Sequence, residues 1–326
     1  MKFDNVRWGI IGCGDVTEKK SGPAFQKVEN SELVAVMRRT GELARDYAER
    51  HQVPKWYDDA NDLIHDPEVD AVYIATPPGS HKEYTLKAAA AGKAVYVEKP
   101  MARNFEECSE MVAACKEAGV PLYVAYYRRA QERFLKIKEL LDQKAIGDIR
   151  FVSATQYQKA RDGVKDPDNL PWRVQPEIAG GGLFFDLASH TLDILDFLLG
   201  PIQKAKGFSS NQAGYYKTED IVTGTYQFQS GVHGIGKWCF TAFEDVDMNE
   251  IVGSEGKISF STFGDDPVIL TTGEGQQQWS FERPEHVHQP LVETIVKELT
   301  GGGEWCQSTG ETGARTSRVM DAIVGK

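Results

Sequence analysis

Short apolar runs alternate with helical patterns through the first 125 residues of this chain. The apolar runs are Val6–Ile11, Leu33–Met37, Ala71–Ala75, Ala94–Val97 and Leu122–Ala125. The helical patterns are Gly41–His51, Ala60–His65, Ser80–Ala91 and Phe105–Gly119. This alternation predicts a parallel sheet covered by helices on both faces, and such a sheet binds ligands beyond the carboxyl ends of its strands.

The pattern changes after a helical segment at Gln131–Leu141. Strand-like runs follow at Ile149–Tyr157, Ile202–Phe208, Ile221–Phe228, His233–Phe240 and Lys257–Phe263. Helical signal then lies mainly at Leu183–Leu199 and in the last forty residues, and Gln158–Ile178 has no regular pattern. We therefore expect an α/β chain of two domains, a parallel-sheet domain at 1–126 and a domain with a large, mostly antiparallel open sheet at 127–326.

The bulk composition excludes some classes of partner. Thirty-seven basic residues stand against 48 acidic ones, a net charge of −11, whereas a surface that binds nucleic acid needs clustered Lys and Arg. No apolar run approaches the roughly 20 residues that span a bilayer, and Met1 leads directly into the first strand without a signal-peptide pattern. The five cysteines are scattered without metal-type spacing, so we expect reduced thiols, no metal site and a cytoplasmic protein.

A glycine-rich turn follows the first apolar run. Gly12 and Gly14 fit the first two glycines of G-x-G-x-x-G, which permit a tight turn and close approach to a pyrophosphate, while Thr17 replaces the third. An ordinary strand-to-helix turn is the alternative. Because Gly22-Pro23 falls where the first helix should run, we expect that helix to be broken. The residues expected to contact the dinucleotide are Gly12, Cys13, Gly14, Asp15 and Val16.

The end of the second strand bears on the choice of cofactor. A carboxylate that binds the ribose 2′-hydroxyl is expected there in NAD-binding domains, but the chain has Arg38 and Arg39. Guanidinium groups pair with phosphate in bidentate geometry, so the sequence favours NADP over NAD, with NAD still possible. The alternative is that either arginine stacks on adenine or is simply solvated, and the nearby Glu42 weakens the preference slightly.

Two segments about ninety residues apart carry the catalytic candidates. Lys99 follows an apolar strand, where it can donate to a substrate oxygen and stabilise negative charge; the alternative is a surface lysine in a turn. Asp186 and His190 are four residues apart, so on a helix they share a face and the carboxylate can orient the imidazole. The alternative is a helix-terminal charge with a core histidine, and Asp193 is a weaker second partner for His190.

Other residues lie near the same expected site. His81 follows Thr76-Pro77 at the start of a helix and is either structural or adjacent to the cofactor. Trp172-Arg173, late in the irregular stretch, contacts either the nicotinamide end of the cofactor or the substrate, or neither. Three tyrosines follow or lie within strands and either line the pocket or pack in the core: Tyr126, Tyr127 and Tyr157.

Taken together, these segments resemble the glucose-fructose oxidoreductase / inositol dehydrogenase (Gfo/Idh/MocA) family over nearly the whole chain. The resemblance rests on Gly9–Val16, on Glu98-Lys99-Pro100, and on Gly181-Gly182 followed by Asp186 and His190. It implies a Rossmann domain followed by an α/β domain with an open, largely antiparallel sheet. It also implies that Lys99 and His190 are catalytic with Asp186 assisting, that the bond before Pro100 is cis, and that Glu98 and Lys99 border the cofactor.

The same resemblance implies substrates such as sugars, inositols and related polyols, and association into a homo-dimer or homo-tetramer through the outer sheet face of the second domain. The sequence hypothesis is therefore an NADP-dependent oxidoreductase that moves hydride to or from a secondary alcohol of a carbohydrate. Two rivals remain: a glycosidase that holds NAD and uses transient oxidation, and a non-catalytic cofactor sensor that acts through protein partners.

Overall fold

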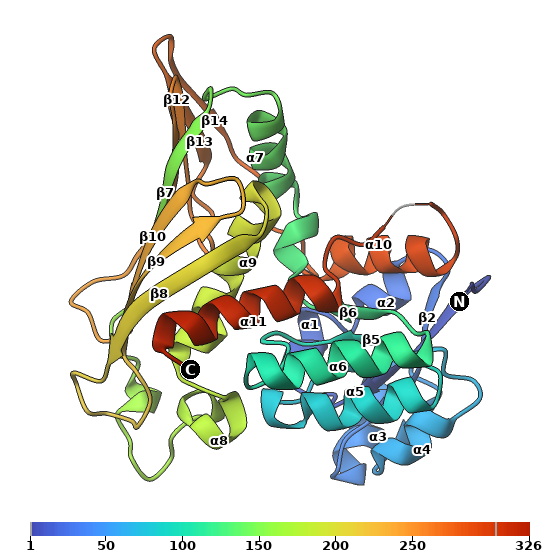
Figure 1. The fold of residues 1–326 in the computed structure, drawn as a ribbon. Helices are drawn as coiled ribbons and strands as arrows, with labels where there is room; N and C mark the ends of the chain where they lie inside the picture. The colour runs from blue at the N-terminus through green and yellow to red at the C-terminus, as the bar shows by residue number, and fades with distance from the viewer. Residues whose placement is uncertain (1, 304) are drawn as a thin grey trace. The chain divides into compact units, whose positions relative to one another are not determined.

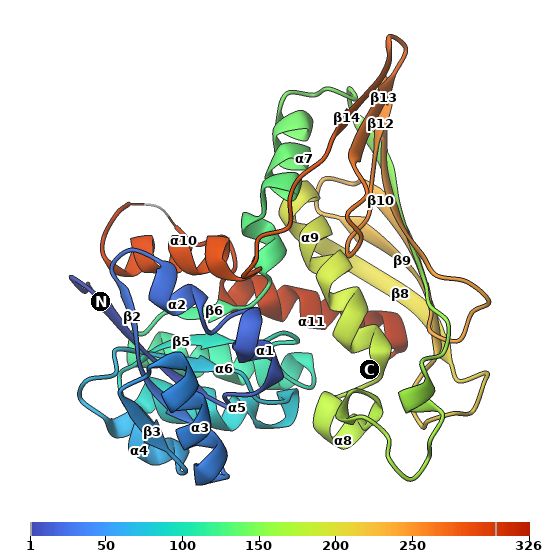
Figure 2. The same cartoon turned by 180° about the vertical axis from the view of Figure 1, so that it is seen from behind.

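The chain folds into two compact units in a computed structural model that describes residues 2–303 and 305–326 (Figures 1 and 2). The first unit comprises the residues up to Ala102, then Glu106–Ala130 and Pro284–Ala314. The second unit comprises Arg103–Phe105, Gln131–Arg283 and Arg315–Lys326.

The first unit is built on a six-stranded parallel sheet with the order β3-β2-β1-β4-β5-β6. Its strands are β1 (Val6–Ile11), β2 (Ser31–Met37), β3 (Lys55–Tyr57), β4 (Ala71–Ile74), β5 (Ala94–Val97) and β6 (Leu122–Val124). Five of them match the apolar runs of the sequence. β3 has only three residues at the sheet edge, which is too short for a periodic signal.

Helices cover this sheet on both faces, as the alternating pattern predicts. The helices, including two short 3₁₀ turns, are α1 (Asp15–Lys19), α2 (Ala24–Lys27), α3 (Gly41–His51), α4 (Ala60–His65), η1 (Pro78–Ser80), α5 (His81–Ala90), α6 (Phe105–Ala118), η2 (Tyr127–Ala130) and α10 (Gln289–Leu299). Apolar residues of α2, α3 and α10 pack with Trp8 of β1 on one face. Those of α4, α5 and α6 pack with Val72 and Val95 on the other. The burial of both faces explains why these strands read as continuous apolar runs.

The first helix is broken, as Gly22-Pro23 predicts. α1 ends at Lys19 and α2 begins at Ala24. A side chain at residue 22 would bring its Cβ within 2.2 Å of the Thr17 carbonyl oxygen and 2.3 Å of the Tyr47 hydroxyl. Glycine is therefore required where the chain turns between the two short helices.

The segment Pro284–Ala314 returns to the first unit, whereas the division at residue 126 assigns it to the second domain. Its helix α10 buries one apolar face, formed by Leu291, Val292, Ile295, Val296 and Leu299, in the same cluster as Trp8 and Phe25. A helix with such a face packs wherever an uncovered apolar surface exists. The sequence alone does not show that the apolar surface covered by α10 is formed by residues near the start of the chain.

The second unit is built on an eight-stranded sheet with the order β14-β13-β12-β11-β7-β10-β9-β8. All neighbours are antiparallel except β10 and β7. The strands are β7 (Ile149–Tyr157), β8 (Ile202–Ser210), β9 (Ile221–Phe228), β10 (His233–Cys239), β11 (Val246–Gly253), β12 (Gly256–Phe260), β13 (Val268–Thr272) and β14 (Gly275–Trp279). Sequence analysis missed β11, β13 and β14. β14 contains three successive glutamines and lies at the sheet edge, so it lacks an apolar face to signal it.

Helices cover one face of this sheet. The helices and short helical turns of this unit are α7 (Glu132–Asp142), η3 (Asp162–Val164), η4 (Trp172–Val174), α8 (Pro176–Ala179), η5 (Phe184–Ala188), α9 (Ser189–Leu199) and α11 (Gly310–Val324). Side chains of α7, α9 and the later part of α11 form a single core with the inward residues of the strands. The other face keeps Phe151, Ile235 and Met248 about half exposed, at 45%, 52% and 46%. Strict alternation of buried and exposed positions in β10 reflects this one-sided cover.

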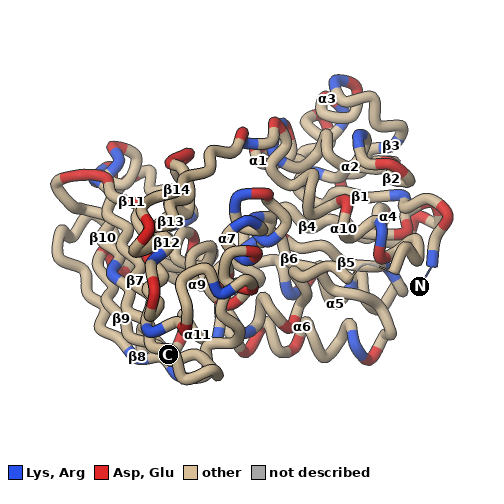
Figure 3. Tube along the Cα trace, turned by 90° about the horizontal axis from the view of Figure 1, so that it is seen from above, with Lys and Arg blue, Asp and Glu red and all other residues tan. Residues whose placement is uncertain are grey.

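Charges are mixed over both units. Acidic and basic positions alternate along the surface elements of the described chain rather than gathering as a basic stripe (Figure 3). In the part of the chain that the structure describes, no helix combines the length and apolarity needed to cross a membrane.

The packing of α10 leads to a stability prediction. We expect Ile295→Ala to lower the free energy of unfolding by about 3 kcal/mol, because it leaves a cavity in the core shared with Trp8. Lys297→Ala, on the exposed side of the same helix, is the matched control and should change it by less than about 0.5 kcal/mol. Denaturant titration followed by circular dichroism measures both. Equal effects of the two substitutions would contradict the assignment of this helix to the core.

Candidate functional site

The glycine-rich turn forms at the carboxyl end of β1. Gly12 has φ of +91°, and a Cβ there would lie 2.8 Å from a Thr76 methyl carbon and 3.1 Å from the Thr76 backbone nitrogen. Gly12 therefore lets the turn pass directly against the end of β4. A Cβ at Gly14 would meet nothing closer than 3.9 Å, so that side of the loop is open. The Cys13 side chain is fully buried, and burial raises the pKa of its thiol to about 11.

Thr17 explains how the loop holds its shape without a third glycine. Its side chain is fully buried and its hydroxyl donates to the Gly14 carbonyl at 2.8 Å. The Tyr47 hydroxyl of α3 donates to the Thr17 carbonyl at 2.9 Å. The substitution in the fingerprint is thus accommodated by two hydrogen bonds that stabilise the turn.

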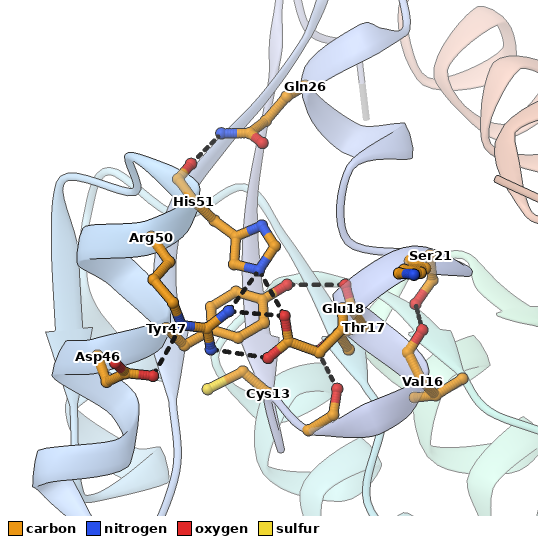
Figure 4. Close-up of polar contacts among 12 residues, drawn as sticks. Cys13, Val16, Thr17, Glu18, Ser21, Gln26, Asp46, Tyr47, Arg50 and His51 are labelled. Atoms are coloured by element: carbon orange, nitrogen blue, oxygen red, sulfur yellow. Dashed lines mark hydrogen bonds and ion pairs between the residues drawn. The ribbon is translucent and has the colours of Figure 1, made fainter. Parts of the chain in front are cut away.

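A charged cluster fixes α1 against α3 beside this loop (Figure 4). The Glu18 carboxylate accepts two hydrogen bonds from Arg50, both at 2.8 Å, and lies 2.8 Å from His51 Nε2. His51 stacks on Tyr47 with ring centroids 4.1 Å apart. The hydrogen bonds from Arg50 lower the pKa of the Glu18 carboxyl to about 2, so it is ionised at neutral pH. A cluster of this kind holds the glycine loop at a fixed distance from the second βα unit.

Arg38 and Arg39 are exposed at the end of β2, next to the glycine loop. A guanidinium nitrogen of Arg38 lies 3.5 Å from the Cys13 carbonyl oxygen, which places this cation over the loop. The first turn of the following helix contributes Glu42. The sheet edge therefore presents two cations where a ribose-binding carboxylate is expected in NAD-specific domains.

His81 lies between the turn after β4 and the segment after Lys99. Its ring is fully buried, with Nε2 2.6 Å from the Thr76 carbonyl and Nδ1 3.1 Å from the Met101 carbonyl. Burial lowers the pKa of this imidazole. Since both ring nitrogens contact backbone oxygens, the geometry favours a positioning role for His81. Pro77, by contrast, is exposed at the same turn.

Lys99 follows the last residue of β5, at the edge of the sheet where β1, β2 and β4 also end. The peptide bond to Pro100 is cis, as the family resemblance implies. The neighbouring Glu98 is 8% exposed and one of its oxygens accepts a hydrogen bond from the Lys99 backbone amide at 3.1 Å. In the first unit, the structure thus brings the glycine loop, the Arg38 end of β2, the Thr76 turn and Lys99 to one edge of a parallel sheet.

Asp186 and His190 belong to the second unit. Asp186 lies in a single π turn and His190 in α9, which begins at Ser189. The four-residue spacing that predicts a common face assumes α geometry, which holds only from Ser189 onward. Asp186 forms an ion pair with Arg173, at 3.2 Å, and Arg173 in turn covers the Trp172 ring at 4.4 Å. The irregular stretch is therefore anchored on the start of the predicted catalytic helix.

His190 is 5% exposed, and its ring meets Phe263 edge to face at 5.6 Å. Asp193, the weaker candidate partner, accepts a hydrogen bond from the Thr316 hydroxyl at 3.4 Å. Lys99 lies in the first unit and His190 in the second. Two of the three tyrosines agree with core or wall packing: Tyr126 is buried and Tyr127 lies against His288.

The second unit also holds polar residues that sequence analysis missed. Gln156 points to the covered face of β7 and is 3% exposed, yet both atoms of its amide lack a hydrogen-bond partner. Trp238, opposite it in β10, is 1% exposed and its indole nitrogen also lacks a partner. On the other side, Asp247 of β11 accepts backbone hydrogen bonds from the turn that carries Phe263. Gln156 was detectable in principle, because it occupies the inward phase of an alternating strand whose other inward residues are apolar.

Buried polar atoms without partners are rare in folded proteins and need an explanation. In the second unit the unpartnered Gln156 amide and Trp238 indole lie on adjacent strands, and an open hollow of about 430 Å³ is lined by Gln156, Asp247 and residues of the loop after β7. The Gln156 amide has both a hydrogen-bond acceptor and a donor, and the Trp238 indole has a donor. Among the described residues, no three His, Cys, Asp or Glu side chains are grouped so as to hold a metal ion.

The Glu18 cluster leads to a pH prediction. Because the pKa of Glu18 is lower in the folded state than its ordinary value of 4.5, the carboxylate stabilises the fold above pH 4.5 and loses that contribution as pH falls towards 2. The difference in unfolding free energy between wild type and Glu18→Gln should therefore shrink over this range. Glu29→Gln, which removes an exposed carboxyl of the same unit, is the matched substitution for comparison. Urea titrations at several pH values measure it, and a constant difference for Glu18 would refute the ion pair.

Comparison with known protein families matches both halves of the chain. Residues 6–126 match the oxidoreductase family with an NAD-binding Rossmann fold, and residues 134–259 match the GFO/IDH/MocA C-terminal domain. The two matches cover the sheet edge that carries Lys99 and the helix that carries His190.

Proteins that are similar in sequence or structure match nearly the whole chain. An oxidoreductase of Formosa agariphila is 41% identical over 98% of both chains. The 1,5-anhydro-D-fructose reductase of Ensifer adhaerens is 31% identical over 98% of this chain and 95% of its own. The crystal structure of an aldose-aldose oxidoreductase from Caulobacter crescentus, complexed with glycerol, superposes with a TM-score of 0.86 at 26% identity, over 98% of this chain and 96% of that one. The chain belongs to the Gfo/Idh/MocA family of oxidoreductases with an NAD-binding Rossmann fold.

Proposed function

We propose that this oxidoreductase transfers hydride between NADP and a secondary alcohol or ketone of a sugar or polyol. In this proposal Lys99 donates to the substrate oxygen and stabilises its negative charge. His190 moves the hydroxyl proton, and Asp186 orients the site. The cofactor supplies the hydride chemistry, while the chain binds, orients and exchanges the proton.

The observation that carries the proposal is the position of Lys99. Lys99 lies just past the carboxyl end of β5, at the same sheet edge as the glycine loop and the Thr76 turn. This is the edge at which parallel sheets hold dinucleotides and their substrates. A lysine there is within the unit that binds the cofactor, so its role does not depend on how the second unit is placed.

The cofactor contacts follow from the same edge. We assign the pyrophosphate to the backbone of Gly12–Val16, where the Gly14 side of the loop is open. The remaining cofactor contacts come from Arg38, Arg39, Thr76, Pro77, Glu98 and Lys99 in the first unit and from Trp172 and Arg173 in the second, with His81 holding the Thr76 turn from behind. Two exposed guanidinium groups without a carboxylate at the end of β2 support NADP over NAD.

A polyhydroxylated substrate is supported by two findings. A relative is named as a 1,5-anhydro-D-fructose reductase, and a structure at 25% identity is a levoglucosan dehydrogenase in complex with NADH and levoglucosan. In this chain, the unpartnered amide of Gln156 and indole of Trp238 suit a ligand that offers several hydroxyl groups. A hydroxyl both donates and accepts, so it can pair with either atom of the Gln156 amide.

Assembly and location complete the proposal. The half-exposed apolar side chains on the open face of the second sheet, among them Phe151 and Ile235, support a homo-dimer or homo-tetramer that covers this face. All five cysteines are free thiols, which supports a reducing compartment such as the cytoplasm.

Turnover with a panel of sugars, polyols and both cofactors tests the activity. Lys99→Met should lower kcat by about 100-fold because it removes the cation that stabilises the substrate oxygen, while cofactor binding measured by fluorescence titration persists. Lys116→Met, exposed on α6, is the matched control. Unchanged kcat in Lys99→Met would remove this lysine from the mechanism. Turnover of a glycoside without net consumption of NADPH would favour the glycosidase instead.

The cofactor preference has its own test. Arg38→Ala should reduce kcat/KM for NADP by roughly tenfold, since it removes charge-assisted hydrogen bonds to the ribose phosphate, and should change the NAD value much less. Arg45→Ala, on the exposed side of α3, is the control. Equal losses with both cofactors would argue that Arg38 contacts a part of the nucleotide that they share.

A further inference from the structure

A chain of buried hydrogen bonds runs beneath the end of β5. The Glu98 Oε1 atom lies 2.5 Å from the Tyr73 hydroxyl, which lies 3.1 Å from the Ser21 hydroxyl. The Ser21 hydroxyl donates to the Val16 carbonyl at 3.2 Å (Figure 4). Tyr73 and Ser21 are fully buried. This series of hydrogen bonds thus connects Glu98, the residue before Lys99, with α1, the helix that follows the glycine loop.

This series of hydrogen bonds has more contacts than its two hydroxyl groups have hydrogens. Three contacts in series need three hydrogens, and the hydroxyl groups of Tyr73 and Ser21 supply two. The Val16 carbonyl can only accept. If Glu98 were a carboxylate, one of the three contacts would bring two oxygens together without a hydrogen between them. A protonated Glu98 supplies the missing hydrogen: it donates to Tyr73, Tyr73 donates to Ser21, and Ser21 donates to Val16.

The other groups around Glu98 are consistent with a neutral acid. Its second oxygen accepts from the Lys99 amide, which a protonated carboxyl still allows. His288 Nε2 lies 3.6 Å from Oε1, and burial lowers the pKa of this imidazole to about 3, so it does not supply a balancing charge. Burial raises the pKa of the Glu98 carboxyl, and it outweighs the hydrogen bonds with Tyr73 and the Lys99 amide and the ammonium groups of Lys99 and Lys20, all of which favour the ionised form.

Further contacts surround the Glu98 carboxyl group. The other ring nitrogen of His288 is 2.9 Å from the Tyr96 hydroxyl, and Tyr96 stacks on Tyr73 at 4.8 Å. His288 also donates its backbone N–H to the Lys20 carbonyl at 3.2 Å. The Glu98 carboxyl is therefore surrounded by β4, β5, the segment after α1 and the returning segment before α10, and the charged groups that act on it most strongly are the ammonium groups of Lys99 and Lys20.

We propose that Glu98 is a positioning residue that holds its proton at neutral pH and, through Tyr73 and Ser21, locks the strand end that carries Lys99 to the segment behind the glycine loop. A neutral acid adds one hydrogen bond to the lock without placing an anion beside the Lys99 ammonium. A neutral neighbour does not form an ion pair with the ammonium that the proposed function assigns to the substrate oxygen. The kinetic part of this inference rests on the proposed function; the protonation state does not.

Infrared spectroscopy of the cofactor-free protein tests the proton directly. At pH 7 the difference spectrum between wild type and Glu98→Gln should contain the carbonyl stretch of a protonated carboxyl group. Glu285→Gln, which removes an exposed carboxyl whose pKa is lowered by Lys27, should instead lose only carboxylate bands. A Glu98 difference spectrum with carboxylate bands alone would overturn the proposal, whether or not the protein turns over a sugar.

Steady-state kinetics test whether the hydrogen bonds from Glu98 through Tyr73 to Ser21 position Lys99. Tyr73→Phe keeps the ring but breaks the chain, so kcat should fall roughly tenfold through misplacement of Lys99, with the dissociation constant of the cofactor changing less than about threefold. Glu98→Gln, whose amide can still donate to Tyr73, should retain roughly fivefold more kcat than Glu98→Ala. Equal kcat in these two Glu98 variants, or an unchanged kcat in Tyr73→Phe, would overturn the positioning role.

Discussion

The parallel arrangement of the first sheet is the constraint on which the rest of the site depends. Because all six strands run the same way, β1, β2, β4 and β5 end at one edge, so that the glycine loop, Arg38, the Thr76 turn and Lys99 are neighbours without being close in sequence. Hydrogen bonding within the sheet sets the spacing of these ends, and helices on both faces fix the sheet. The chemistry proposed here is a consequence of that geometry, because a single lysine elsewhere on the surface could do none of it.

Polar contacts then hold the loops of this edge in place. Thr17 replaces a glycine by bonding to Gly14, Glu18 ties α1 to α3, and His81 bridges the Thr76 turn and the segment after Lys99. Each of these groups is paired, as the cost of desolvation requires. Glu98 follows the same rule in a different way: its neighbours supply two protons for three contacts, so the acid itself completes the chain. The apolar cores above and below the sheet stabilise the fold, whereas these polar contacts specify where the loops lie.

The second unit follows a different plan. Its sheet is covered on one face only, and its inward residues alternate with exposed ones. Where that alternation carries a polar residue inward, as at Gln156, the structure leaves hydrogen-bonding capacity unused. The π turn at Phe184–Ala188 lies between Arg173, which pairs with Asp186, and the start of α9. Departures from regular geometry in this unit therefore coincide with the residues assigned to substrate and proton transfer, as is common where function competes with local stability.

The sequence by itself determined five of the six strands of the first sheet, the break at Gly22-Pro23, the glycine loop and the identity of the residues at the strand ends. These features depend on local periodicity, on the fixed φ of proline and on the special freedom of glycine. Only the tertiary structure decided that α10 returns to the first unit, that β11, β13 and β14 extend the second sheet, and that Gln156 and Trp238 are unpartnered. Only the tertiary structure revealed the series of hydrogen bonds from Glu98 through Tyr73 to Ser21. These features depend on which distant surfaces meet and on how many protons lie between buried oxygens, and a linear pattern of residues records neither.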